Sequence, residues 1–144
     1  MGKKKIARKA GGEMDASLKE RSLSRVPKKK VLAGILYIDS TYNNTKILLT
    51  DASGNAIAWS STGALGFKGA KKGTPFAAAK VGELIGDKAT LIGMKEAKIV
   101  IKGVGAGRES ALRSFASRGI NLLTVSDRTP VPHNGPRPPK PRRV

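Results

Sequence analysis

The last sixteen residues, Thr129–Val144, restrict the fold more than any other stretch of the chain. They hold six of the eight prolines, four Arg or Lys residues and no acidic residue. Proline fixes φ and lacks a backbone N–H, so this segment cannot continue a helix or occupy a central strand. Apart from Val131 and Val144 it has little to bury, and we predict an extended, polyproline-like arm. A cationic arm of this composition needs an anionic partner.

Charge is distributed unevenly along the 144 residues. The chain carries 28 Lys and Arg against 10 Asp and Glu, which gives a formal net charge of +18. Residues 1–30 hold eleven basic and three acidic groups, residues 31–127 twelve and seven, and residues 128–144 five and none. The excess predicts a polyanionic partner, either nucleic acid or an anionic membrane surface. The pattern divides the chain into a flexible basic N-terminal extension (1–30), an α/β body (31–127) and the C-terminal arm (128–144).

Composition also argues against several other classes of protein. No apolar run reaches the roughly 18–20 residues that a membrane span requires. The N-terminus shows no signal peptide pattern, and the chain has no cysteine for a disulfide, a thiol nucleophile or a Cys-type zinc site. We therefore expect a cytoplasmic protein without a membrane association.

Hydrophobic patterning predicts five strands in the body. Val31–Asp39 is a nearly continuous apolar run, which is typical of a strand buried on both faces. The segment Asp51–Asn55 has turn composition, with Gly54 and Asn55 suited to positive φ. The other predicted strands are Lys46–Asp51, Ala56–Ser61, Ala97–Lys102 and Ile120–Ser126.

The first main helix has a clear start signal. Thr74 is a suitable N-cap and Pro75 suits the first helical position. Apolar residues at three-and-four spacing continue to Ile92, so a helix of about four turns is predicted to pack on the sheet. Gly82 and Gly86 lie inside this helix and would permit the close approach of a neighbouring element.

A second main helix is predicted over Arg108–Arg118, with Gly119 ending it as a left-handed C-terminal residue. A short helix over Ala16–Leu23 is compatible with the N-terminal sequence. The order of elements in the body indicates a single α/β domain with a five-stranded mixed sheet, two main helices and basic extensions at both ends.

The loop Gly63–Gly73 is a candidate for nucleic-acid contact. It has few side chains to obstruct a groove, and Lys68, Lys71 and Lys72 are suited to bind backbone phosphates. Phe67 either stacks on a base or anchors the loop to the core, and anchoring is the better-supported interpretation.

Two turns offer further polar groups. The turn Gly103–Gly107 fails the dinucleotide-binding pattern, because its third glycine comes one residue early. It predicts either a phosphate site beside Arg108 at a helix N-terminus or a tight connection, and residues alone do not separate the two. Asn43 and Asn44 are explained by turn chemistry, although their amides also suit bases and ribose.

Catalytic chemistry has little support in this sequence. The single histidine, His133, lies in the arm and has no obvious carboxylate partner. A metal-dependent nuclease would need acids grouped at strand ends, whereas scattered aspartates are more often caps and turn residues. The three candidates are Asp39, Asp51 and Asp127. We predict no enzyme activity, no metal site and no cofactor.

Several short motifs together resemble one family. The chain is similar to the universal S-eleven family of small-subunit ribosomal proteins, in its bacterial form. In order along the chain, the motifs are Tyr42–Thr45, Thr50–Asn55, Trp59–Gly63, Gly66–Gly69, Thr74–Ala78, Lys102–Arg113 and Asp127–Val144.

This resemblance implies a ribonuclease-H-like fold without its catalysis and a structural role in the ribosome. It further implies binding to 16S ribosomal RNA on the platform, close to messenger RNA at the exit side where the Shine–Dalgarno helix forms. The implied protein neighbours are small-subunit proteins seven and eighteen, with six and twenty-one where present. A free-standing nucleic-acid-binding regulator remains the alternative.

The residues that we expect to contact RNA are polar or basic, and they lie in the loops, the second helix and the arm. They are Asn43, Asn44, Lys68, Lys71, Lys72, Arg108, Arg113, His133, Asn134, Arg137, Lys140, Arg142 and Arg143. Asn134 precedes Gly135, which leaves the following amide unhindered, and we therefore predict isoaspartate formation at Asn134.

Overall fold

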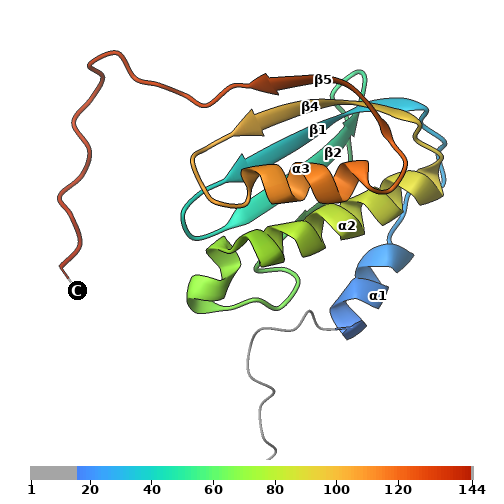
Figure 1. Ribbon diagram of the computed structural model, residues 1–144, viewed down its shortest axis with the longest axis horizontal. Coiled ribbons are helices and arrows are strands. Elements are labelled where there is room, and N and C mark those ends of the chain that lie inside the picture. Colours follow the sequence, from blue (N-terminus) through green and yellow to red (C-terminus); the bar gives the residue numbers. More distant parts are fainter. Residues whose placement is uncertain (1–15, 144) are drawn as a thin grey trace, which may run out of the picture.

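The computed structural model describes residues 16–143. Residues 1–15 of the predicted N-terminal extension, together with Val144, lie outside the described residues. The elements are α1 (Ala16–Ser24), β1 (Ala33–Ser40), β2 (Thr45–Asp51), β3 (Ala56–Ser61), the 3-10 helix η1 (Gly69–Gly73), α2 (Pro75–Ile92), β4 (Glu96–Lys102), α3 (Arg108–Ala116) and β5 (Asn121–Asp127). Figure 1 shows α2 and α3 crossing the sheet, with the arm leaving from β5.

The five strands form one mixed sheet in the order β3-β2-β1-β4-β5. β1 pairs antiparallel with β2, and β2 pairs antiparallel with β3, which makes a meander of three strands. β4 pairs in parallel with both β1 and β5. The predicted α/β class and five-stranded mixed sheet are therefore confirmed.

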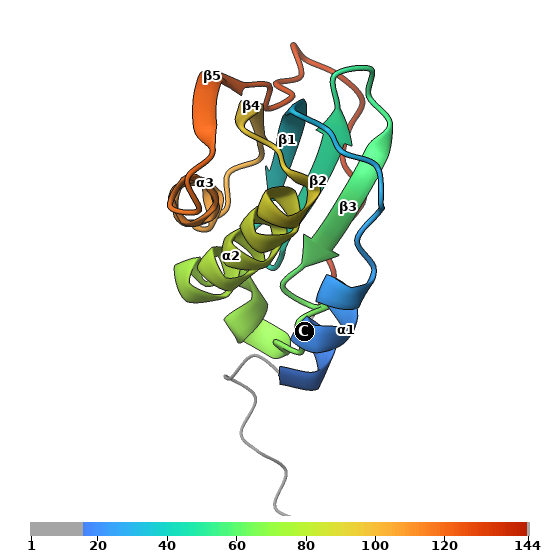
Figure 2. The same cartoon turned by 90° about the vertical axis from the view of Figure 1, so that its right-hand side faces the viewer.

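Both main helices pack on the same face of the sheet (Figure 2). Alternate residues of the strands point toward these helices, and the apolar face of α2 packs against those residues. The largest fully buried side chains of this core are Phe115, Leu36, Ile38, Ile47, Leu49, Leu65, Leu84, Ile85, Ile99 and Val81.

The prediction that β1 is buried on both faces is wrong. Its residues alternate between buried and half-buried, and only its first residue is exposed. Tyr37 pairs with Leu48 and Val100 in neighbouring strands, and Leu48 pairs with Trp59, so these side chains shield one another without a covering helix. Trp59, on the edge strand, remains 65% exposed. An apolar run in a central strand thus reflects cross-strand packing as well as burial.

Local sequence signals set the bounds of α2 as predicted. The Thr74 hydroxyl accepts a hydrogen bond from the Ala77 N–H at 3.3 Å, and Pro75 begins the helix. Gly93, with φ of 88°, ends it in the left-handed conformation. The predicted end of α3 is less accurate, because the helix stops at Ala116 and Gly119 takes φ of 83° in the turn that follows.

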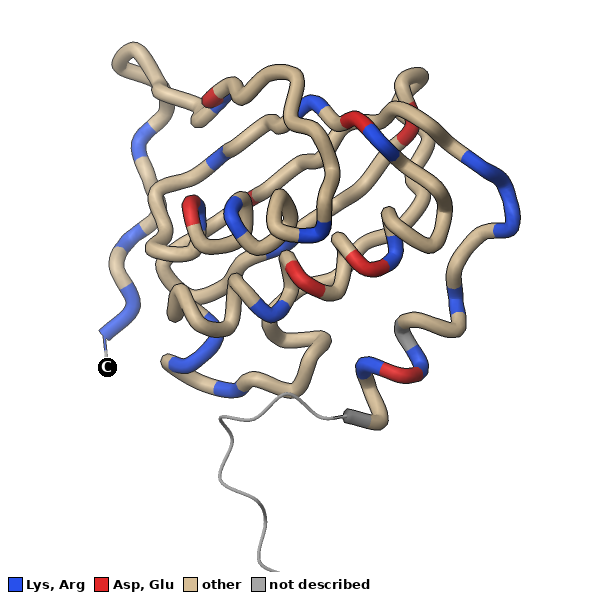
Figure 3. Tube along the Cα trace, turned by 45° about the vertical axis from the view of Figure 1, so that its right-hand side comes forward, with Lys and Arg blue, Asp and Glu red and all other residues tan. Residues whose placement is uncertain are grey.

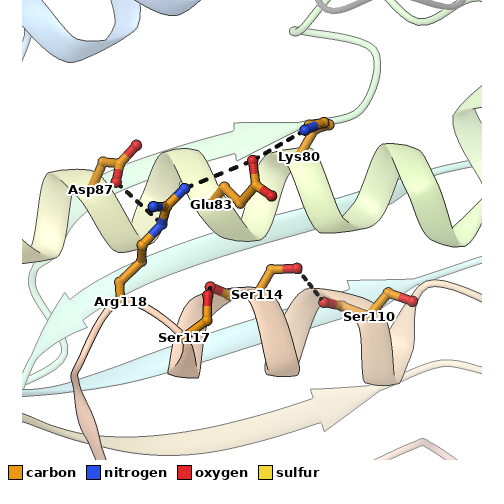
Figure 4. Close-up of polar contacts among 7 residues, drawn as sticks. All are labelled: Lys80, Glu83, Asp87, Ser110, Ser114, Ser117 and Arg118. Atoms are coloured by element: carbon orange, nitrogen blue, oxygen red, sulfur yellow. Dashed lines mark hydrogen bonds and ion pairs between the residues drawn. The ribbon is translucent and has the colours of Figure 1, made fainter.

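Close packing between α2 and α3 explains Gly82 and Gly86. A Cβ at Gly82 would lie 2.6 Å from the Ala111 carbonyl oxygen, and one at Gly86 would lie 2.6 Å from Cγ of Arg118. The predicted close approach is confirmed, and the neighbouring element is α3. Figure 4 shows Arg118 reaching from the end of α3 to Asp87 and Glu83 of α2.

The short helix suggested by Ala16–Leu23 is present as α1. It lies near α2 at the lower right in Figure 1 and near β3 in Figure 2, and Leu23 packs against the hydrophobic core. Part of the predicted flexible extension is therefore a helix that contacts the body.

Candidate nucleic-acid interface

The loops singled out from the sequence emerge at the same end of the sheet. β1, β3, β4 and β5 run in one direction, so their carboxyl ends lie along one edge of the domain. The β1–β2 turn, the loop after β3, the turn after β4 and the arm after β5 all begin there. In Figure 1 this end is on the left, where the arm leaves the body. We call it the loop end.

The β1–β2 turn is closed by its own hydrogen bonds. The Thr41 N–H donates to the Asn44 carbonyl oxygen at 2.8 Å. The Asn44 side-chain oxygen accepts from the Thr62 hydroxyl at 2.6 Å, which ties this turn to the loop after β3. Asn43 is exposed, and so is Tyr42 at 78%. Within the described residues the Asn43 amide makes no hydrogen bond, so it is the more available of the two asparagines.

The loop after β3 is anchored by its apolar residues and presents its lysines. Phe67 is 2% exposed and Leu65 fully buried, which confirms the interpretation of Phe67 as an anchor. Lys68 and Lys71 are exposed and Lys72 is half-buried. Within residues 16–143 none of these three lysines forms an ion pair. The 3-10 helix η1, which the sequence patterning did not reveal, holds Lys71 and Lys72 in its last turn.

The turn after β4 is glycine-rich because it packs against the β1–β2 hairpin. A Cβ at Gly103 or Gly105 would overlap the carbonyl oxygen of Ser40 or Thr41, and one at Gly107 would lie 2.5 Å from the Thr45 hydroxyl oxygen. The Gly105 N–H donates to the Ser40 carbonyl at 2.8 Å. These contacts favour the tight-connection interpretation for the glycines.

Arg108 is held by the body. Its guanidinium donates to the Gly103 carbonyl oxygen and to Asp127 Oδ2, the latter at 2.6 Å. Arg113 lies one turn further along α3, where its side chain is 80% exposed and pairs with Glu109 at 3.4 Å. Of the two arginines predicted to bind RNA from α3, Arg113 is therefore the more accessible.

The arm starts from a fixed point and is then free of the body. The Thr129 N–H and hydroxyl both donate to Asp127 Oδ1, and the Gly103 N–H donates to the Thr129 hydroxyl at 3.1 Å. These bonds, with Arg108, hold the pKa of Asp127 well below its usual range, Thr129 contributing most. Beyond this point the predicted contact residues are exposed and, within residues 16–143, their side chains make no hydrogen bond. They are His133, Asn134, Arg137, Lys140, Arg142 and Arg143.

Positive charge follows the arm and the loop after β3 (Figure 3). The acids of α2 are engaged elsewhere: Glu83 pairs with Lys80 and Asp87 with Arg118. The loop end therefore presents basic groups, while part of the acidic charge is neutralised on the helical face. Patterning missed two exposed aromatic rings at this end. Tyr42 sits in a polar turn, and Phe76 is 57% exposed beside Lys80, whose Nζ lies 5.4 Å from the ring centroid.

Of the three aspartates considered for a nuclease, Asp51 and Asp127 accept hydrogen bonds from the residues that follow them, and Asp39 lies within β1. Asp51 accepts hydrogen bonds from the Ser53 and Asn55 N–H groups, both at 2.9 Å, and the Asn55 side chain lowers its pKa most. Within residues 16–143 no three His, Cys, Asp or Glu residues are grouped as metal ligands would be. None of the described helices has both the length and the apolar character to cross a membrane.

The comparison with known families gives a match over most of the chain. The model for ribosomal protein S11 matches residues 34–143. The chain belongs to the ribosomal protein S11 family. S11 proteins are structural components of the small ribosomal subunit that bind ribosomal RNA, a non-enzymatic role. The S11 match begins in β1 and includes the loop end and the arm, whereas α1 lies before it.

Proposed function

We propose that this protein binds 16S ribosomal RNA through the loop end and its arm, and that this contact places it on the platform of the small subunit. The observation that carries the proposal is the grouping of three loops and the arm along one edge of the sheet. The basic groups of this edge are presented together, as binding to one folded RNA requires. The S11 match over residues 34–143 supports the same partner.

The loop after β3, the β1–β2 turn and the arm have separate roles in the proposal. Lys68, Lys71 and Lys72 bind backbone phosphates from the loop after β3, and the exposed Asn43 amide contacts ribose or a base edge. The arm threads between RNA helices where the globular body cannot follow. Specificity comes chiefly from RNA shape, because side chains cannot read the deep groove of an A-form helix.

The position on the subunit follows the family resemblance. The protein lies near messenger RNA at the exit side, where the Shine–Dalgarno helix forms. Its neighbours there are small-subunit proteins seven and eighteen, with six and twenty-one where these are present. The assembled particle is cytoplasmic.

The test compares two pairs of substitutions with equal charge change. Arg142→Ala with Arg143→Ala removes two cations from the arm. Lys95→Ala with Lys98→Ala removes two exposed cations from β4 and the residue before it, at the end of the sheet opposite the loop end. Binding to 16S ribosomal RNA is measured against salt concentration, and incorporation is measured by co-sedimentation with small subunits.

We expect the arm pair to lower the slope of log affinity against log salt by about 0.9 for each duplex phosphate that the arm no longer neutralises. The control pair should leave the slope unchanged. Equal slopes for the arm pair and the wild type, with equal incorporation, would remove the arm from the interface. A protein that stays in the light fractions of the gradient would instead be a free-standing regulator.

A further inference from the structure

Lys88 of α2 is a largely buried lysine, with 6% of the residue exposed. Within residues 16–143 its ammonium group has no side-chain ion pair, and it reaches solvent, because no fully buried side-chain nitrogen there lacks a hydrogen-bond partner. Burial lowers the pKa of Lys88, and the positive charge of Arg25 lowers it further. An anion bound beside this lysine would favour its charged form.

The neighbouring carboxylates do not serve this lysine. Glu83 and Asp87 both point toward α3, where they pair with Arg118 at 3.8 and 3.3 Å (Figure 4). Glu83 also binds Lys80 at 3.4 Å. Glu83 and Asp87 therefore form their ion pairs on the side of α2 that faces α3, and not with Lys88.

Lys88 lines a partly open cavity of about 490 Å³ between α1, α2 and β3. Two further cations from α1 and the residue that follows it, Arg21 and Arg25, line the same cavity. No carboxylate is among the lining residues, and the others are Leu18, Ile57, Ala58, Trp59, Ser60 and Ala64. Three basic residues therefore line one space that no carboxylate lines, and a bound anion would offset the repulsion between their charges.

We propose that this cavity binds a phosphate group of RNA, held by Lys88, Arg21 and Arg25. A planar guanidinium offers paired donors to phosphate oxygens, and a lysine adds a point charge. The cavity is larger than a phosphate group and opens to solvent, as a phosphodiester with ribose on both sides requires. The identity of the RNA rests on the proposed function, whereas the phosphate chemistry is a property of the cavity itself.

The site extends the interface beyond the region that the family match covers. Arg21 and Arg25 precede residue 34, where the S11 match begins, and Lys88 lies within it. The N-terminal segment thereby gains a role, since α1 brings two of the three cations to the cavity.

The binding of phosphate is measured directly by isothermal titration calorimetry. The full-length protein is titrated with inorganic phosphate at constant ionic strength, with chloride as the replaced anion. We expect saturable binding in the wild type and an affinity weaker by roughly tenfold or more in Lys88→Met. The exposed control Lys95→Met should bind as the wild type does.

A second variant tests the site without the substitution of Lys88, which is largely buried in α2. Arg21 and Arg25 are exposed residues, so Arg21→Gln with Arg25→Gln leaves the core intact. This pair should also weaken phosphate binding. A phosphate titration that does not saturate, or equal affinities in the wild type, Lys88→Met and the Arg21/Arg25 pair, would overturn the site.

The salt dependence of binding to 16S ribosomal RNA separates the sources of the phosphate. Lys88→Met should lower the slope of log affinity against log salt by about 0.7 to 0.9, the value for one phosphate. Phosphate binding with an unchanged slope would overturn the assignment to RNA and leave a site for free phosphate. Wild-type binding to RNA without any phosphate binding would refute the cavity alone, whereas phosphate binding without RNA binding would refute the proposed function alone.

Discussion

The guanidinium of Arg108 donates to the carboxylate of Asp127 at 2.6 Å and so joins the first turn of α3 to the last residue of β5. The second carboxylate oxygen of Asp127 accepts two hydrogen bonds from Thr129. A single aspartate therefore fixes the direction in which the arm leaves the sheet.

The first prediction concerns the acid sensitivity of this junction. Because the pKa of Asp127 is lower in the folded protein than in the unfolded chain, its charge stabilises the fold above about pH 4. This stabilisation is lost progressively as the pH falls below that value. Asp127→Asn should therefore lower the melting temperature at pH 7, and the difference from the wild type should shrink on acidification. Glu109→Gln, which removes a carboxylate that is 79% exposed, controls for net charge. A pH-independent difference would contradict the prediction.

The second prediction separates helix propensity from packing at two glycines of α2. Alanine in a helix interior gains about 1 kcal/mol over glycine, whereas overpacking costs about 1–3 kcal/mol. At Gly82 the new methyl group would meet the Ala111 backbone, which cannot move away, so Gly82→Ala should lower the free energy of unfolding by about 1–2 kcal/mol. At Gly86 it would meet Cγ and Cβ of Arg118, which are side-chain atoms that can shift more easily than backbone, so Gly86→Ala should be less destabilising than Gly82→Ala. Urea unfolding of both variants measures the contrast, and equal losses would count against it.

The ion pairs between α2 and α3 give the third prediction. Arg118 pairs with Asp87 and Glu83, and all three side chains are about a third exposed. Arg118→Gln should therefore destabilise the protein by only about 0.5–1 kcal/mol, and the loss should decline in 1 M NaCl. Arg113→Gln removes a more exposed cation of α3 and should have almost no effect. Chemical unfolding at two salt concentrations checks both variants.

The fourth prediction is isoaspartate formation at Asn134. Asn134 has φ of 58°, and within residues 16–143 it is the only non-glycine residue with positive φ. It is exposed, as is Gly135. Peptide mapping after incubation at mildly alkaline pH should detect isoaspartate at Asn134 and none at Asn43 or Asn44. Gly135→Ala should slow the reaction, because a methyl group hinders the attacking amide. Finding only unmodified Asn134 would refute the prediction.

Local signals in the sequence were sufficient for most element bounds. Thr74 and Pro75 are adjacent in the sequence, and together they specify the start of α2. Strand β3 runs over Ala56–Ser61, as predicted. Gly54 takes the predicted positive φ at 93°, whereas Asn55 does not. Helix starts, strand bounds and turn conformations depend on residues that are neighbours in the sequence, so they can be predicted from the sequence alone.

Features that depend on contacts between distant segments were not predictable in the same way. The partners of Arg108 lie 5 and 19 residues away, and the sequence could not choose between a phosphate site and a tight connection. The half-buried outer face of β1 depends on side chains of β2, β3 and β4. The cavity beside Lys88 requires α1 to lie against β3, which no periodicity in either segment reveals.

The mutual bonding of the loops has a thermodynamic consequence. Thr62 binds Asn44, Gly105 binds Ser40, and Gly73 packs against the Tyr42 backbone, so the surface of the loop end is already formed in the free protein. Docking of this rigid surface restricts little backbone, and the conformational entropy cost of association comes mainly from the arm and from lysine side chains. The prolines of the arm reduce even that cost, because they narrow the range of unbound conformations.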